Sequence, residues 1–465
     1  MEAFFIANMA PIMFGSLVVF LLLGYPAAFS LGAVGLLYGI VGIELGQFAP
    51  NFLQALPDRI YGVMSNDTLL AIPFFTFMGI VLERSGMAED LLDTIGQLFG
   101  TVRGGLAYAV VFVGALLAAT TGVVAASVIS MGLISLPIMM RYGYDRRVAS
   151  GVIAASATLG QIIPSSLVII VMADQLGKSV GDMYEGAFIP GLVLAMLYAF
   201  YVFLVSLFFP KATPGLPVEA VGFREMSGSR GVWQLGLLVA FSGTVGYYVI
   251  QQTEVKAGAD FVVLTMGVAI SSAFTCSVLN KYFGRERLHI TAIVAVALGV
   301  AWYVLNGSGH ENWALLSLTL FTGSAYALVA ALIEKSTGFR FISTLAEQVI
   351  FVMVPPLALI FLVLGTIFIG VATPTEGGAM GATGALLLGA AKRRLSFDLI
   401  RQATESTAKL SAFVVFILLG ARVFSLTFYG VSGHVWVENM LTSLPGGQTG
   451  FLIFVNAFVF VLAFF

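Results

Sequence analysis

This 465-residue sequence contains many stretches without Asp, Glu, Lys or Arg; ten of them map most of the chain, and the first of these runs for 41 residues. A helix needs about 20 apolar residues to cross the hydrocarbon core of a bilayer, so most of these stretches are long enough to be spans. They cover residues 3–43, 104–140, 148–173, 186–210, 231–253, 261–280, 290–309, 312–333, 348–375 and 377–391. The sequence therefore predicts an all-α polytopic membrane protein.

The composition agrees with this prediction and excludes other classes. Apolar residues make up 59% of the chain and charged residues 10%, whereas a soluble domain has about 45–50% and about 25%. A net charge of −2 provides no basic stripe for nucleic acid. The single cysteine, Cys276, excludes internal disulfides and cysteine metal sites, and the three histidines show no ligand spacing.

Lys and Arg are distributed unequally between the loops. If the amino terminus is outside, seventeen of them fall inside and only Arg59, Lys178 and Lys256 fall outside. Positive residues accumulate on the cytoplasmic side of membrane proteins, so we expect the amino terminus outside. In this topology the first stretch, with Gly24-Tyr25-Pro26 near its middle, forms two spans separated by a sharp break.

Residues 104–140 have basic residues at both ends, so the chain must enter and leave the membrane on one side. The turn is expected at Thr120-Thr121-Gly122, and the segment is either two full spans or a re-entrant hairpin. Irregular backbone at membrane depth is tolerated only where protein or a water-filled cavity satisfies it. A hairpin therefore implies a cavity and, in a transporter, a binding site.

A second break is expected within residues 148–173, at the sequence GQIIPSS of residues 160–166. Pro164 removes a helix donor and frees carbonyl groups. Gln161, Ser165 and Ser166 can solvate these carbonyls or coordinate a small cation. The alternative is a proline kink that the serine hydroxyls repair locally.

The sequence Thr373-Pro374-Thr375-Glu376 separates two apolar stretches and has two interpretations. Thr373 as N-cap, Pro374 at the first helical position and Glu376 three residues after the cap form a capping box. Alternatively, Glu376 and the threonine hydroxyls face a transport cavity, because intramembrane carboxylates are costly and usually functional. Both can hold together.

Two further polar features also have two interpretations each. Arg422, within residues 410–437, is either a buried functional cation or an arginine that snorkels from the edge of a span. The pair Asn66-Asp67 is either a helix cap or part of an outer vestibule.

Residues 24–35 and 373–384 resemble each other, because each places a proline before a small-residue helix with a Gly-x-x-Gly pair. In the predicted topology the first proline lies inside and the second outside, so the two copies are inverted. Inverted repeats, with binding near the midplane at broken helices, are the usual frame of a secondary transporter.

Several motifs in order resemble one family. They are LLAIPFFTFMG at residues 69–79, RGGLA at 103–107, TG at 121–122, RYGY at 141–144, IPSS at 163–166, FIPG at 188–191 and TPTE at 373–376. Over residues 1–210 and 345–465 the chain is similar to the large membrane subunit of TRAP transporters, the tripartite ATP-independent periplasmic carriers. It is most similar to the branch described as mannitol/chloroaromatic compound transporters.

This resemblance implies an elevator-type secondary transporter of the bacterial inner membrane rather than an enzyme. It implies an ion-coupled importer of small organic acids such as carboxylates, usually driven by Na⁺. It also implies two partners, a periplasmic solute-binding protein and a small four-span membrane subunit. We expect no cofactor, and no metal ion beyond the transported Na⁺.

The resemblance also assigns the candidate site residues by position. The expected ion ligands are Thr76, Gly79, Thr121, Gly122 and Ser127. The residues expected to line the substrate cavity are Thr158, Gly160, Gln161, Pro164, Ser165, Ser166, Thr373, Thr375 and Glu376.

Two departures from the family pattern stand out. Val123 and Val124 occupy positions where the family usually has serines. Since hard cations need oxygen ligands, the site would then depend on backbone carbonyls and on Thr120 or Thr121, or its ion differs. Residues 211–345 are also longer than the usual cytoplasmic connection and carry four additional apolar stretches. They form either a lipid-facing brace or a replacement for part of the small subunit.

The expected organisation is a first repeat unit at residues 1–210, an inserted four-span segment at 211–345 and the start of a second inverted unit at 346–465. A second unit as long as the first would extend past Phe465. We therefore expect the native protein to continue beyond this residue, and residues 1–465 alone not to transport.

A channel and a membrane-embedded enzyme are the alternatives to a carrier. An enzyme needs a nucleophile, a paired acid and base, or a metal, whereas the intramembrane candidates are Glu376 and Arg422. A channel needs neither inverted broken helices nor a binding protein. The sequence therefore favours the carrier.

Overall fold

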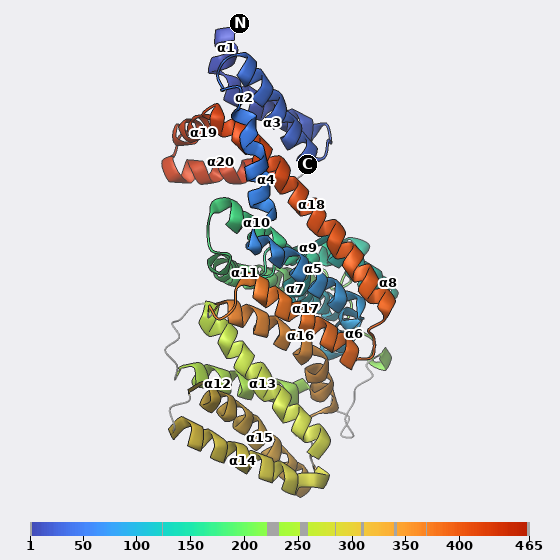
Figure 1. Ribbon diagram of the computed structural model, residues 1–465. Helices are drawn as coiled ribbons and strands as arrows, with labels where there is room; N and C mark the ends of the chain where they lie inside the picture. The colour runs from blue at the N-terminus through green and yellow to red at the C-terminus, as the bar shows by residue number, and fades with distance from the viewer. Residues whose placement is uncertain are drawn as a thin grey trace. The chain divides into compact units, whose positions relative to one another are not determined.

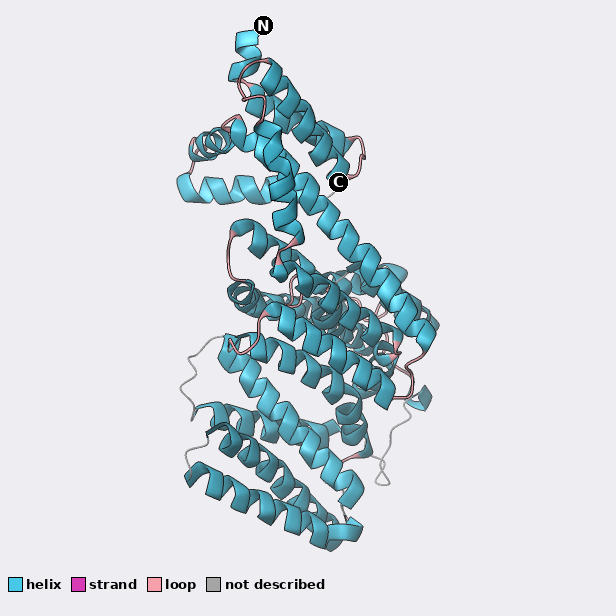
Figure 2. Cartoon of the chain, in the orientation of Figure 1, coloured by secondary structure: helices cyan, strands magenta, loops and turns pink. Residues whose placement is uncertain are grey.

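The computed structural model describes residues 2–122, 124–220, 232–251, 259–283, 285–307, 311–338, 342–368 and 370–462. The regular structure within these ranges is helical and contains no strand (Figure 1; Figure 2). Among the described helices, eight are long and apolar enough to cross a membrane, or up to ten if each of two bent pairs is one span. The prediction of an all-α polytopic membrane protein is confirmed.

The helices form two compact units, each described by itself. Unit 1 combines Met1–Asp67 with Ala408–Phe465, and unit 2 is Thr68–Thr407. The predicted segments 1–210, 211–345 and 346–465 are instead consecutive in the sequence and correspond to a repeat unit, an insertion and a second repeat unit. That division stays a prediction.

Unit 1 is built from helices near the two ends of the chain. They are α1 (Glu2–Ala7), α2 (Met9–Leu22), α3 (Ala27–Glu44), η1 (Phe52–Ala55), α4 (Leu56–Met64), α18 (Phe397–Gly430) from Ala408 onward, α19 (Gly433–Thr442) and α20 (Gly447–Leu462). The predicted break in the first apolar stretch is confirmed. Gly24 has a φ of +82° and Pro26 directly precedes α3, so the chain turns between α2 and α3.

Small residues bring α3 and α18 close together within unit 1. A Cβ atom built on Gly35 would lie 2.8 Å from the backbone of Phe424, and one on Gly420 would lie 2.4 Å from the Ala28 carbonyl oxygen. The Thr427 hydroxyl donates to the Gly35 carbonyl at 2.8 Å. Backbones can approach this closely only where side chains are absent. Arg422, on the same helix, is half-buried, and its two interpretations stay open.

Unit 2 begins at Thr68, within η2 (Asp67–Leu70), which directly follows Asn66. The helices before the insertion are α5 (Ala71–Arg84), α6 (Met87–Phe99), α7 (Gly105–Thr121), α8 (Val124–Arg141), α9 (Arg146–Thr158), η3 (Leu159–Gln161), α10 (Leu167–Leu176), α11 (Val180–Phe208) and η4 (Val218–Ala220). The helices after it are α16 (Thr344–Phe368), α17 (Pro374–Ala391) and the first residues of α18.

The four additional helices predicted for the insertion are present within unit 2. They are α12 (Val232–Gln251), α13 (Ala259–Phe283), α14 (Leu288–Gly307) and α15 (Glu311–Thr337), with the short η5 (Arg285–Arg287) before α14. Each contains a segment long and apolar enough to cross a membrane. Leu238, Cys276 and Ala346 belong to one buried core, so α12 and α13 pack against α16, while α15 packs on α13 and α14 on α15.

Glycines also set the packing of α17 on α5, which lie side by side in unit 2 (Figure 1). A Cβ atom on Gly378 would lie 2.9 Å from the Phe74 Cβ, and one on Gly381 would lie 2.4 Å from the Met78 sulfur. The small-residue helix predicted after Pro374 is therefore a packing surface. It is the surface that holds α5 in place.

We predict that Gly35→Ala destabilises the protein and that Gly32→Ala, one turn earlier on α3, does not. Overpacking typically costs about 1–3 kcal/mol, and the new methyl at position 35 meets backbone that has no side chain to move. At Gly32 no atom lies within 4 Å of the built Cβ, so the higher helix propensity of Ala is the main effect. Thermal unfolding in detergent checks this, and equal midpoints for the two variants would contradict it.

Candidate functional site

The α7–α8 hairpin turns at a single glycine. Gly122 lies between α7 and α8 with a φ of +58°, in the left-handed region that favours glycine. A Cβ atom at this position would lie 2.7 Å from the Ser165 carbonyl oxygen. The predicted turn is confirmed at Gly122. Val123 and the side chains of Thr120 and Thr121 lie outside the described residues.

The predicted break after α9 is also confirmed. The helix ends at Thr158, passes through the 3-10 turn η3 and resumes as α10 at Leu167, with Ser166 as its N-cap residue. Ser165 has a φ of +89°, which is rare for a residue with a side chain. Its hydroxyl donates to the Ala119 carbonyl at 2.7 Å. This bond joins the break to the last turn of α7 and helps to hold the strained backbone.

The hairpin tip and the helix break therefore meet in one buried place, which we call the junction: residues 119–122 and 163–167. Ile163, Pro164, Ser165, Ser166 and Leu167 are all buried. Two interrupted helices thus cover each other's irregular backbone, as required away from water. The junction is the candidate functional site.

Three buried hydroxyls lie on helices that pack at or beside the junction. Thr76 on α5, Ser156 on α9 and Ser166 at the start of α10 are 0% exposed. None of the three hydroxyl oxygens has a hydrogen-bond partner among the described residues. Buried polar atoms almost always have a partner. Hydroxyl oxygens are also ligands that a hard cation accepts, so these three are the candidates for contact with an ion.

α7, whose last turn belongs to the junction, packs against both α5 and α9. A Cβ atom on Gly114 would lie 2.6 Å from the Ser156 Cβ, so α7 and α9 cross at close range. α5 also contacts α10 and carries Gly79 one turn after Thr76, both of them buried.

The other residues assigned to the site divide into buried and exposed positions. Gly160 and Ser127 are buried, whereas Thr158 and Gln161 are exposed. The Thr158 hydroxyl donates to the Ala155 carbonyl of its own helix at 2.7 Å. Thr158 and Gln161 therefore lie beside the junction and not within its buried part.

The capping box at the start of α17 is confirmed. The Thr373 amide and hydroxyl both donate to a Glu376 carboxylate oxygen, at 2.8 and 2.9 Å, and the Glu376 amide donates to the Thr373 hydroxyl at 3.3 Å. Glu376 is exposed and Thr375 half-buried. A role for these residues in a transport cavity stays a prediction.

Two polar groups in unit 2 were absent from the sequence-based site. Glu83 on α5 accepts a hydrogen bond from the Ser130 hydroxyl on α8, and its other carboxylate oxygen is buried without a partner among the described residues. The Tyr184 hydroxyl on α11 is likewise buried and unpartnered in this part of the chain. Glu83 could have been identified from the sequence, because a carboxylate in the last turn of an apolar helix is a candidate functional residue.

The model of the family described as tripartite ATP-independent periplasmic transporter, DctM component, matches residues 14–310 and 314–465. The C4-dicarboxylate TRAP transporter large permease protein DctM of Pseudomonas aeruginosa is 34% identical over 225 residues, covering 48% of this chain and 51% of that protein.

Two relatives carry other solutes in their names. The ectoine TRAP transporter large permease protein TeaC of Halomonas elongata is 22% identical, over 64% of this chain and 69% of that protein. The isethionate TRAP transporter permease protein DctMQ of Oleidesulfovibrio alaskensis is 25% identical, over 57% of this chain and 41% of that protein. The chain spans about half the length of the first curated relatives it matches.

We predict that Gly122→Leu abolishes transport while the protein stays folded. A side chain at this φ costs about 1–2 kcal/mol, and its bulk would push the Ser165 carbonyl away from the hairpin tip. Gly132→Ala on α8 is the matched control, since no atom lies within 4 Å of its built Cβ. Uptake assays on protein that passes a thermal unfolding check test this. Normal uptake by the Gly122 variant would remove the hairpin tip from the mechanism.

A second prediction separates the two interpretations of Glu376. Glu376→Gln keeps an acceptor for the Thr373 amide, so it should retain the capping box, whereas Glu376→Ala should lose it and lower the unfolding temperature. If Glu376 only caps α17, the glutamine variant transports at the normal rate. A slow glutamine variant with an unchanged unfolding temperature would place the carboxylate in the transport path instead.

Proposed function

The chain belongs to the DctM component family of tripartite ATP-independent periplasmic transporters, and from that premise we propose that it acts as the large membrane subunit of an ion-coupled importer of small organic acids. The observation that carries this proposal is the junction. There the hairpin tip and a proline-broken helix meet at Gly122 and Ser165. Broken helices near the midplane are where secondary transporters bind their ligands.

A carrier accounts for the observations better than an enzyme. The curated relatives are named as permeases of C4-dicarboxylates, isethionate and ectoine. The junction holds hydroxyl and carbonyl oxygens, whose chemistry suits binding and release of a solute or ion. Neither of the enzyme candidates from the sequence, Glu376 and Arg422, belongs to it.

Na⁺ is the coupling ion in our proposal. A hard cation is bound by oxygen ligands, and Thr76, Ser156 and Ser166 present buried hydroxyl oxygens that have no partner among the described residues. Ser127 is buried on the second arm of the hairpin. Such a set of neutral oxygens suits a monovalent cation, because a divalent ion would draw on carboxylates to balance its charge.

A small organic acid is the proposed substrate class. C4-dicarboxylates and isethionate, which appear in two of the relatives' names, are organic anions. An anion that enters together with Na⁺ has its charge compensated during transport. Ectoine, in the name of a third relative, widens the family's range. The mannitol/chloroaromatic branch stays a prediction.

The proposed partners are a periplasmic solute-binding protein and a small four-span membrane subunit. The description of the family as a tripartite periplasmic system supports three components. The protein is a multi-pass membrane protein, and the inner membrane with the amino terminus outside is the location we propose. The unequal distribution of Lys and Arg supports this orientation. The elevator mechanism and the inverted repeats stay predictions.

We predict that uptake requires an inward Na⁺ gradient and the matching binding protein. The native protein, reconstituted in proteoliposomes with its small subunit, should accumulate a labelled organic acid only when both are supplied. Replacing Na⁺ by choline on both sides should reduce uptake to background. A proton gradient without Na⁺ is the matched control for the identity of the ion.

Counterflow in the same vesicles distinguishes the three functional classes. A carrier saturates and exchanges internal for external solute, a channel does neither, and an enzyme returns a chemically changed product. Uptake that persists without any cation gradient or binding protein would overturn the proposal.

A further inference from the structure

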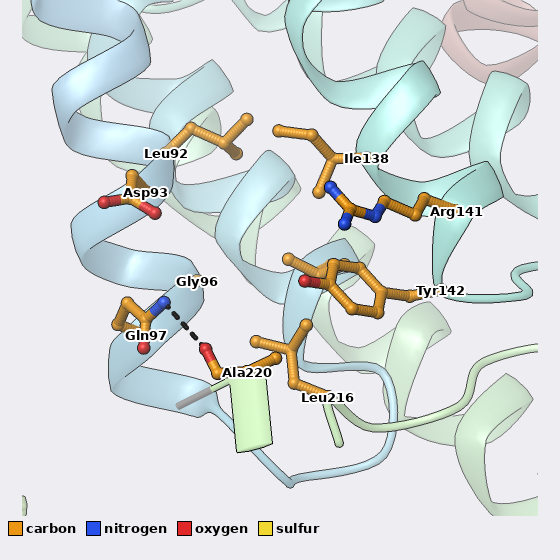
Figure 3. Close-up of a pocket in the computed structure, with 10 residues that line it drawn as sticks. Leu92, Asp93, Gly96, Gln97, Ile138, Arg141, Tyr142, Leu216 and Ala220 are labelled. Carbon is orange, nitrogen blue, oxygen red and sulfur yellow. Dashed lines mark hydrogen bonds between the residues drawn. The ribbon is translucent and has the colours of Figure 1, made fainter. Parts of the chain in front are cut away.

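A pocket of about 220 Å³ lies in unit 2, away from the junction (Figure 3). It is open to the surface and is lined by α6, the start of α7, the end of α8 and the segment that follows α11. Pockets for drug-sized ligands measure about 300–1,000 Å³. This pocket therefore suits a smaller group.

The segment after α11 is fastened over this pocket by backbone hydrogen bonds. The Leu216 amide donates to the Gly100 carbonyl, and the Gly104 amide donates to the Thr213 carbonyl, each at 3.0 Å. A Cβ atom on Gly215 would lie 2.2 Å from the Thr101 carbonyl oxygen, so only glycine permits this approach. The pocket wall is therefore a defined part of the fold.

Two opposite charges face the pocket from different elements. The Arg141 guanidinium at the end of α8 points into the pocket, and Asp93 on α6 lines it from the opposite side (Figure 3). Neither side chain has an ion-pair or hydrogen-bond partner in the described part of the chain. Asp90, one turn earlier on α6, differs, since Lys392 and Arg394 bind it at 2.9 and 3.0 Å.

The rest of the lining is a hydroxyl and apolar side chains. Tyr142 follows Arg141 and its hydroxyl also lies at the pocket (Figure 3). Leu92, Leu106 and Ile138 supply apolar surface. The Gln97 amide is already bound to the Ala220 carbonyl at 3.3 Å. The free polar groups are therefore one anion, one cation and one hydroxyl.

The predicted topology puts Arg141 at the inner end of the apolar stretch 104–140, and on that basis we place the pocket at the level of the lipid headgroups. It sits at the base of the hairpin, where α7 begins at Gly105 and α8 ends at Arg141. α6 is amphipathic, with Leu91, Leu92 and Ile95 buried and Glu89 and Asp93 exposed. The apolar face of α6 packs against α7 and α16, and its polar face leaves Asp93 at the pocket.

We propose that this pocket binds a zwitterion with a phosphate and a primary ammonium group, as in the headgroup of an ethanolamine phospholipid. Arg141 binds the phosphate, whose geometry suits a guanidinium, and the Tyr142 hydroxyl donates to the same group. Asp93 accepts hydrogen bonds from the ammonium. A headgroup that is only anionic meets repulsion from Asp93, and a choline headgroup has no N–H to donate.

To test the proposal, the purified protein is placed in nanodiscs that contain equal amounts of ethanolamine, choline and glycerol phospholipids. It is then extracted, and native mass spectrometry identifies the lipids that it retains. The wild type should retain the ethanolamine lipid preferentially. Asp93→Asn should lower its retention relative to the glycerol lipid about tenfold, and Arg141→Gln should lower the retention of both lipids about tenfold, each corresponding to about 1.4 kcal/mol. Tyr142→Phe should lower the retention of the ethanolamine lipid less. Glu89→Gln and Arg147→Gln, exposed on α6 and α9, are the matched controls and should retain it fully.

The outcomes separate the sources of the ligand and do not depend on transport. Soluble phosphoethanolamine that binds the wild type but not the two variants, without retention of the lipid, would assign the site to a free zwitterion. Equal retention by wild type, Asp93→Asn and Arg141→Gln, all with unchanged unfolding temperatures, would overturn the proposal. The proposal would also be overturned if the wild type preferred the glycerol lipid and Asp93→Asn retained that lipid even more strongly.

Discussion

Backbone groups that leave a helix at membrane depth have no water to bond with, and every irregular segment there needs protein around it. This constraint governs unit 2. Pro164 interrupts one helix and Gly122 turns another, and the two irregular segments are packed against each other. The Ser165 hydroxyl bonds the Ala119 carbonyl across that contact at 2.7 Å. The candidate site is thus a consequence of how the fold satisfies its backbone, and the buried Thr76, Ser156 and Ser166 hydroxyls at or beside it are what the proposed cation would use.

Close helix packing is the second feature that depends on this environment. Lipid tails are as apolar as the side chains, so helices associate through tight contact and not through exclusion of water. Glycine supplies that contact in both units, at Gly35 and Gly420 in unit 1 and at Gly114, Gly378 and Gly381 in unit 2. These glycines therefore have a packing role at particular pairs of helices, whereas others, such as Gly32 and Gly132, have no atom within 4 Å of a built Cβ.

The few charged residues have distinct tasks. Glu376 closes a capping box, and Asp90 joins α6 to the turn after α17 through two basic side chains. Glu83 is held by Ser130 inside the unit. Asp93 and Arg141 face a small pocket without such partners, and that difference is the basis of the proposed headgroup site. The junction, by contrast, is built from neutral oxygens. The proposed cation site and the proposed zwitterion site of unit 2 therefore differ in the chemistry of their polar groups.

Local residue patterns were enough to predict the long apolar helices, the breaks at Gly24–Pro26, Gly122 and residues 160–166, and the capping box at Thr373 as one of two interpretations, because each depends on residues a few positions apart. What each break contacts could be seen only in the folded chain. The contact of Gly122 with Ser165, the burial of the Ser156 hydroxyl and the bond from Ser130 to Glu83 join segments far apart in the chain. Periodicity and local motifs carry no information on such contacts, because they arise from the packing of whole helices against one another.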